Sequence, residues 1–177
     1  MIGIERWICA CCPPKKRSRN GPTVTSSPAV TVSTGNPDAA AASDFPVETV
    51  QAGDEREVGP FRLRFFGGKH AEIHRSIPII DNLGVLVNDA LYYPGDSFAV
   101  PEGVDVQVLA APAGAPWMKI GEAMDYVVQL APKRAFPTHE MLLSTAGKAI
   151  SNARLGWAAE QGGGEYLPLE PGDTIDL

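Results

Sequence analysis

The composition of the chain changes abruptly near Phe45, and this change limits which part can fold. Residues 1–44 are rich in Pro, Ser, Thr and Ala and show no helical or strand periodicity. A segment of this kind has too few large apolar side chains to build a core. We therefore predict that residues 1–44 are disordered and that residues 45–177 form one domain of ordinary size.

The charge is also unevenly distributed. Residues 1–20 hold five basic residues and one acidic residue, whereas the remainder holds ten basic and twenty acidic residues. An acidic body argues against a nucleic-acid surface, which needs a basic stripe. No apolar run is long enough to cross a bilayer, no signal peptide is recognisable, and the cysteines suggest no disulfide framework. We expect a cytoplasmic protein that binds neither nucleic acid nor membrane.

Three interpretations compete for the N-terminal segment, where Cys9, Cys11 and Cys12 precede KKRSR. The first is that the segment is not native, because a frameshift or wrong start has joined unrelated coding to an intact C-terminal part. The second is a membrane anchor, in which acylated cysteines act with a polybasic patch. The third is metal binding by C-x-C-C, which ranks last because a fourth ligand is missing.

From residue 45 onward the sequence predicts short strands first and helices later. Residues 47–68 read as two or three strands, a hairpin turns at Asn88-Asp89, and VDVQVLAAP reads as a buried strand. RAFPTHE reads as a further strand that ends in a loop, and EYLPLEPGDTIDL as a last hairpin. This order favours a sheet covered on one face by helices.

Two helices are predicted from apolar spacing. The first spans residues 119–131 and is stopped by Pro132; its apolar positions are Ile120, Met124, Val127, Val128 and Ala131. The second spans residues 145–161, with Ser144 or Thr145 as its cap and glycines at its end. Its apolar face comprises Ala146, Ala149, Ile150, Ala153 and Trp157.

The residues suited to chemistry lie where strands run into loops. The chain has only three histidines, His70, His74 and His139, each in a segment with glycine or proline nearby, and Asp96 follows a Gly turn. Imidazole and carboxylate groups together suit zinc and similar metals, and a carboxylate can bridge two ions. Taken singly, a loop histidine is more often a surface residue, and an Asp in Pro-Gly-Asp-Ser more often forms a turn.

Taken in order, the pieces FGGKHAEIH, IPIIDNLGVLV, LYYPGDS, VDVQVLAAPAGAPWMK and PTHEMLLS resemble the second half of a metallo-β-lactamase-fold metallohydrolase. Within that superfamily they are most similar to the bacterial branch of general hydrolases, which includes ascorbate-phosphate lactonase-like proteins. The resemblance covers residues 46–177. It implies an α+β fold, namely the C-terminal half of an αββα sandwich with one mixed sheet covered by two helices.

The resemblance also implies roles for individual residues. His70, with His74 as the fallback, corresponds to a ligand of the first metal, and His139 to a ligand of the second. Asp96 corresponds to the catalytic carboxylate that bridges both ions. Trp117 is expected to line the approach for substrate, with a buried packing aromatic as the alternative. The implied cofactors are two divalent ions, zinc first, with manganese or iron as alternatives; the implied reaction is hydrolysis of an ester, lactone or phosphoester.

One departure from the family decides the expected activity. The first half of the family fold supplies an HxHxDH motif, but this chain has no histidine before His70. A catalytic zinc normally needs three converging protein ligands. We therefore expect a truncated hydrolase homologue that binds metal weakly or not at all and turns over no substrate alone. The alternative is a non-catalytic half-domain that acts by self-association or by complementation with a separate N-terminal half.

A missing half would also leave the inner face of the sheet uncovered. An exposed apolar patch of that size favours self-association, so a homo-oligomer is one expected partner. The candidate side chains for this face are Phe61, Leu63, Phe65, Val85, Val87, Val106 and Val108.

Overall fold

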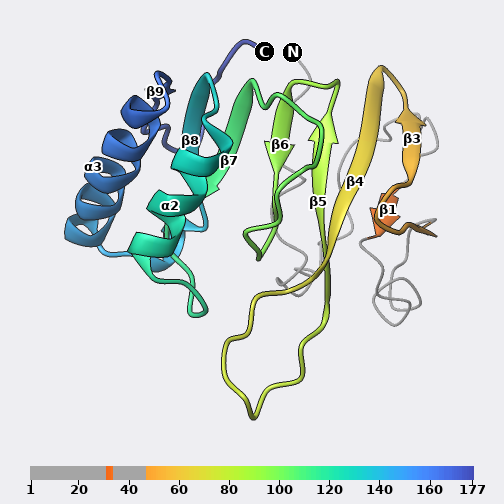
Figure 1. The fold of residues 1–177 in the computed structure, drawn as a ribbon, viewed down its shortest axis with the longest axis horizontal. Helices are drawn as coiled ribbons and strands as arrows, with labels where there is room; N and C mark the ends of the chain where they lie inside the picture. Colours follow the sequence, from red (N-terminus) through yellow and green to blue (C-terminus); the bar gives the residue numbers. More distant parts are fainter. Residues whose placement is uncertain (1–30, 34–46) are drawn as a thin grey trace, which may run out of the picture.

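The computed structural model describes residues 31–33 and 47–177, which form a seven-stranded sheet with two helices packed on one face (Figure 1). The strand order is β3-β4-β5-β6-β7-β8-β9. Pairing is antiparallel from β3 to β6 and parallel from β6 to β9. The predicted α+β class, with one mixed sheet and two helices, is confirmed. The strands are β3 Glu55–Val58, β4 Phe61–Lys69, β5 Asp81–Val87, β6 Leu91–Tyr93, β7 Val108–Pro112, β8 Arg134–Thr138 and β9 Glu165–Tyr166.

A separate two-stranded sheet pairs β1 (Thr31–Ser33) with β2 (Val47–Thr49) in parallel. β1 falls inside residues 1–44, the segment predicted to be disordered. The rest of residues 1–44, including the three cysteines and KKRSR, lies outside the described residues.

The predicted hairpin between β5 and β6 is confirmed. Val87 pairs with Leu91, and the turn residues Asn88 and Asp89 have φ of 50° and 54°. Three residues, 88–90, separate the paired Val87 and Leu91, and the Ala90 N–H donates to the Val87 carbonyl at 3.0 Å. Asn and Asp tolerate the positive φ that the turn requires at its two central positions. The turn therefore sets the register that carries into β6.

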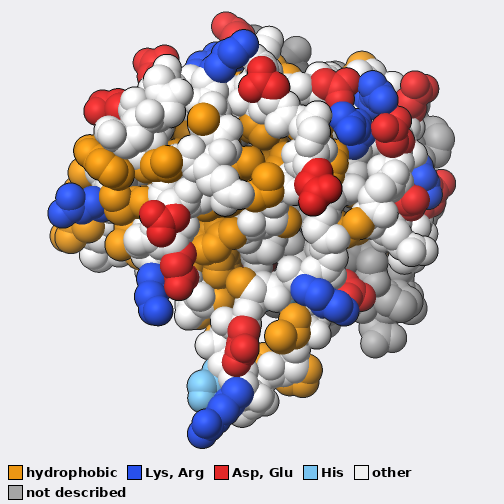
Figure 2. Space-filling view, viewed as in Figure 1, with side chains coloured by type: hydrophobic (Ala, Val, Ile, Leu, Met, Phe, Trp, Pro, Cys, Tyr) orange, Lys and Arg blue, Asp and Glu red, His pale blue; other side chains and the backbone are white. Residues whose placement is uncertain are grey.

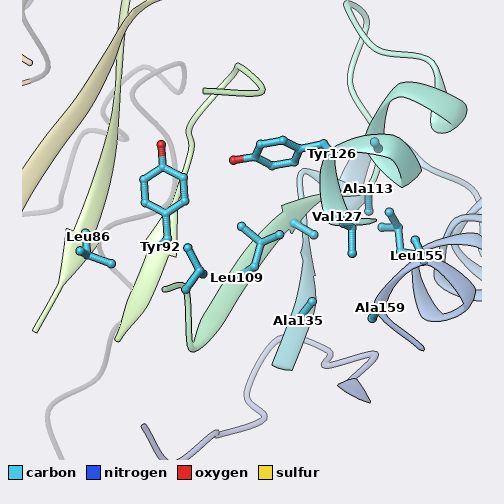
Figure 3. Close-up of a cluster of buried hydrophobic side chains, with 13 residues drawn as sticks. Leu86, Tyr92, Leu109, Ala113, Tyr126, Val127, Ala135, Leu155 and Ala159 are labelled. Carbon is cyan, nitrogen blue, oxygen red and sulfur yellow. The ribbon is translucent and has the colours of Figure 1, made fainter. Parts of the chain in front are cut away.

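The helix-covered side of the sheet holds the larger core. Leu86, Tyr92 and Leu109 from the strands meet Val127 of α2 (Ile120–Leu130) and Leu155 of α3 (Thr145–Gln161), as Figure 3 shows. These side chains are all fully buried. Burying a large aliphatic or aromatic side chain contributes about 1.5–3 kcal/mol each, so this cluster is what fixes the helices on the sheet.

The opposite face of β4 and β5 is not the open surface that the sequence predicted. Leu63, Phe65 and Leu83 are buried there and cluster with Val50, which is fully buried. Of the seven candidates for an uncovered face, none is exposed, and Val106 belongs to the cluster beneath the helices. The prediction of an exposed apolar face is therefore wrong for these residues.

The helix boundaries match the sequence prediction, but one helix face does not. In α3 the Ser144 hydroxyl accepts a hydrogen bond from the Gly147 N–H at 3.1 Å, as the cap prediction required. The helix buries Ser151, Leu155, Ala158 and Ala159, and it exposes all five residues of its predicted apolar face. The buried side carries Leu155, Ala158 and Ala159, which pack in the core cluster with α2 and the sheet, so Ile150 and Trp157 lie at the surface.

The last predicted hairpin does not form. Only Glu165 and Tyr166 make a strand, β9, which pairs in parallel with β8. Pro168 and Pro171 lack the backbone N–H that a returning strand would need. No helix within the described part of the chain has the length and apolarity needed to cross a membrane.

Candidate functional site

Four strands deliver the predicted site residues to one edge of the sheet. β4 and β6 both run antiparallel to β5, and β6, β7 and β8 are mutually parallel, so these four strands end at the same edge (Figure 1). His70 directly follows β4, Asp96 lies three residues after β6, and His139 directly follows β8. Trp117 lies in the loop after β7. The strand order thus gathers residues that are far apart in the sequence.

Asp96 lies between two histidines. Its Oδ2 is 3.8 Å from Nε2 of His70, and its Oδ1 is 3.7 Å from Nε2 of His139. All three side chains are largely buried. Both separations exceed a direct hydrogen bond. Each carboxylate oxygen faces a different imidazole.

Trp117 contacts this carboxylate directly. Its indole N–H donates a hydrogen bond to Asp96 Oδ1 at 3.0 Å. The indole also meets the rings of His70 and Phe98 edge-on, with centroids 6.3 and 4.9 Å away. A charge-assisted bond from a ring held on two sides fixes the orientation of the carboxylate. Whether Trp117 also lines a substrate path stays a prediction.

The backbone that carries Asp96 is held by a residue that the sequence reasoning missed. The buried amide of Asn82 accepts from the Asp96 N–H at 2.9 Å and donates to the Pro94 carbonyl at 2.9 Å. It also donates to Ser97 Oγ at 3.0 Å. Asparagine is uncommon inside strands. Its presence in the apolar run DNLGVLV is therefore the sequence signal that could have indicated a special role for Asn82.

Gly95 completes this turn because no other residue fits. Its φ is +68°, and a Cβ there would lie 2.3 Å from Asn82 Oδ1. The Asp96 carbonyl in turn accepts from the Ala71 N–H at 2.9 Å, which ties the turn to the loop that follows His70. The sequence prediction of a Gly turn before Asp96 is confirmed.

His139 is held in an unusual backbone conformation. Its φ is 59°, in the left-handed region, and it precedes the short 3₁₀ helix η1 (Glu140–Leu142). Histidine is one of the non-glycine residues found there, although uncommonly. Its ring stacks on Tyr93 with centroids 6.2 Å apart, and the Tyr93 hydroxyl is 3.3 Å from Nε2. Tyr93 is thus a second site neighbour that the sequence did not indicate.

His74 does not join the cluster. It is exposed in the loop between β4 and β5, where its Nδ1 lies 2.7 Å from Ser76 Oγ and accepts from the Ser76 N–H at 3.2 Å. His70 alone therefore occupies the position for which His74 was the fallback.

The cluster brings together two imidazoles and one carboxylate, from His70, His139 and Asp96. No group of three or more His, Cys, Asp or Glu side chains in the described part of the chain is arranged to hold a metal ion.

Comparison with known proteins places the chain by fold. No protein-family model matches it. A relative, Protein Rv0786c of Mycobacterium tuberculosis, is 43% identical over 125 residues, which is 68% of this chain and 58% of the relative. The chain therefore spans less than two thirds of the length of the curated relative that it matches.

Two solved structures are similar to the chain. The first is Igni18, a metallo hydrolase from the archaeon Ignicoccus hospitalis. The match covers 75% of this chain and 61% of the Igni18 chain, with 17% sequence identity and a TM-score of 0.53. The second is the metallo-beta-lactamase fold protein YhfI of Bacillus subtilis. The match covers 69% of this chain and 51% of the YhfI chain, with 16% sequence identity and a TM-score of 0.43. The likeness to Igni18 shows that the chain has the fold of part of a metallo hydrolase.

Proposed function

We propose that this chain carries one side of a metal-dependent hydrolase centre, in which Asp96 lies between two ions and His70 and His139 each serve one of them. The observation that supports this most is the Asp96 carboxylate, which turns one oxygen towards each imidazole at 3.7 and 3.8 Å. The shared fold with a metallo hydrolase adds support. The substrate class is an ester, lactone or phosphoester.

In this proposal, neighbouring residues of the chain fix the position of the Asp96 carboxylate. Trp117 and Asn82 hold the Asp96 side chain and backbone, so the carboxylate is fixed before any ligand arrives. With two protein ligands for each ion, the chain alone binds metal weakly or not at all and turns over no substrate. Zinc is the first choice of metal, with manganese or iron as alternatives.

A second candidate function is a non-catalytic half-domain that acts by association. It is favoured by the same count of ligands, because a second copy or a separate polypeptide could supply the donors that the described residues lack. In that case metal binding would strengthen when the second component is added.

Calorimetric titration of the full chain with zinc tests the proposal. We expect binding weaker than micromolar that is lost in Asp96→Asn and His139→Ala and retained in the control His74→Ala. A submicromolar site that is stoichiometric with protein would contradict the incomplete centre. Zinc binding that survives Asp96→Asn in a chain whose Cys9, Cys11 and Cys12 are replaced by serine would contradict the assigned residues.

A further inference from the structure

An ion-pair network joins helix α3 to the segment that carries His139. Lys148, near the start of α3, places its Nζ 2.8 Å from Glu170 Oε2 and 3.9 Å from Glu140 Oε1. Glu140 directly follows His139 in the chain and opens η1. Figure 2 shows charged side chains spread over the surface, whereas those of Lys148 and Glu140 are only 19% and 13% exposed. Charges that are largely shielded from water are screened less by salt than charges on the open surface.

Lys148 supplies the positive charge beside Glu140. Among the ion pairs of the described residues, Lys148 is the one cation that meets this carboxylate. Tyr166 of β9 also lies near it, since burial, and after it the charge of Glu140, raise the pKa of the Tyr166 hydroxyl. That hydroxyl already donates to Asn152 Oδ1 at 2.9 Å. Glu140 therefore depends on Lys148 for the compensation of its charge.

The outer end of the network is a closed turn near the C-terminus. The Glu170 N–H donates to Asp173 Oδ2 at 2.9 Å, and the Asp173 N–H donates to the Glu170 carbonyl at 2.9 Å. The turn thereby fixes the residue whose carboxylate bonds to Lys148. An ammonium group has three donors, so Lys148 can serve both of its carboxylates at once.

The backbone at His139 needs such support. Its φ of 59° lies in the left-handed region, and a non-glycine residue stays there where its surroundings fix it. The Thr138 carbonyl accepts a backbone hydrogen bond from the loop after β7 at 2.8 Å, and a Cβ on Gly114 would lie 2.7 Å from Leu143 Cγ. The segment is thus held just before His139 and again at Leu143. Lys148 supplies the contact between these two points.

We propose that Lys148 is a positioning residue for His139, which it keeps facing Asp96 by anchoring Glu140. Without the ammonium group, the Glu140 carboxylate would be largely buried and uncompensated, and it would move towards water. One peptide bond joins Glu140 to His139, so this movement turns the backbone that carries the imidazole. The inference goes beyond the proposed function, because it concerns the position of His139 whether or not a metal binds there.

NMR of the full chain with labelled histidines tests the proposal, with a chelator present so that no metal contributes. The two site histidines form a matched pair for this measurement. The His139 ring lies 6.2 Å from the Tyr93 ring, and the His70 ring lies 6.3 Å from the Trp117 ring, between centroids. Both contacts should give nuclear Overhauser effects in the parent chain.

The variant Lys148→Met keeps the apolar stem and removes the charge. We expect it to shift the His139 ring signals and to abolish the effect between His139 and Tyr93, while the effect between His70 and Trp117 remains. Lys148→Arg keeps a cation and should restore the His139 contact. Glu170→Gln, at a side chain that is 57% exposed, should shift the His139 signals in the same direction by a smaller amount.

The control variant is Lys133→Met, because Lys133 is exposed and precedes β8, whereas His139 follows the other end of that strand. An unchanged His139 contact in Lys148→Met, or an equal loss in Lys133→Met, would overturn the proposal. Loss of the His70 contact as well would also overturn it, because the substitution would then disturb the whole fold. An absence of any His139 shift in Glu170→Gln would overturn the part assigned to the C-terminal turn.

Discussion

The Asp96 turn and the loop between β4 and β5 meet at the same site but are built in opposite ways. The turn is buried and held by the Asn82 amide and the Ser97 hydroxyl. The loop, from residue 72 to residue 80, is exposed throughout and bears unpacked isoleucines. The turn fixes the Asp96 carboxylate through buried hydrogen bonds, whereas the isoleucines of the loop lie exposed to solvent. This difference predicts that substitutions in the turn lower the free energy of unfolding strongly and that equivalent substitutions in the loop lower it only slightly.

Among substitutions of polar side chains, the largest effect is expected for Asn82→Ala. It leaves the Asp96 N–H and the Pro94 carbonyl without their buried partner, and each unsatisfied group costs about 1–3 kcal/mol. We expect a loss of roughly 3 kcal/mol in the free energy of unfolding, measured in urea. A loss below about 1 kcal/mol would show that the turn holds its shape without the amide.

Alkaline pH should weaken the same region through two tyrosines. Tyr92 and Tyr126 both donate to the Ala99 carbonyl at 2.9 Å, and burial raises the pKa of each above its usual value near 10 (Figure 3). The unfolded chain releases these protons at a lower pH than the folded chain. Stability is therefore full below about pH 10 and falls as pH rises further, by about 1.4 kcal/mol per pH unit for each tyrosine.

Unfolding of the parent chain and of Tyr126→Phe at pH 9 and pH 11 measures this slope. The variant lacks one of the two ionisable hydroxyls, so its stability should fall less steeply over this range. The same slope in both proteins would mean that Tyr126 does not contribute to the alkaline loss.

Most of the fold followed from local sequence signals, whereas the burial pattern did not. Asn88-Asp89 located a turn, and Pro132 and Ser144 marked a helix end and a helix start, because each of these residues acts on backbone within a few positions of itself. The buried face of α3 was missed because alanines on two sides of a helix give no preferred side. Leu155 decides it only through its partners in α2 and the sheet.

The sequence indicated which residues lie together at this edge of the sheet, but it did not indicate the hydrogen bonds that hold them. His70, Asp96 and His139 were singled out by their places after strands together with the family resemblance, and the strand order brings them together. Their roles as metal ligands stay a prediction. Asn82 and Tyr93 were missed because their roles depend on neighbours that are remote in the sequence. Hydrogen bonds between segments that are distant in the sequence cannot be read from the local sequence pattern.

Two serines, one in the turn and one in the loop, allow the stability of the two regions to be compared with the same substitution, and the expected losses are smaller. Ser97→Ala removes a buried hydroxyl that accepts from Asn82 and donates to the Pro94 carbonyl. Ser76→Ala removes an exposed hydroxyl that lies 2.7 Å from Nδ1 of His74. We expect losses of about 1–2 kcal/mol for Ser97 and below about 0.5 kcal/mol for Ser76, by thermal unfolding. Equal losses would remove the distinction between turn and loop.

The smallest effect is expected for Ile77→Ser. The side chain is 46% exposed, so the folded state loses little apolar burial when it is replaced, and surface substitutions usually stay within about 0.5 kcal/mol. Leu83→Ser, in the adjoining strand β5, is the contrasting variant, because Leu83 is buried and its truncation should cost about 2–5 kcal/mol. Both are measured by urea unfolding. A loss above about 1.5 kcal/mol for Ile77→Ser would mean that the loop packs against the body, in which case its isoleucines support the fold.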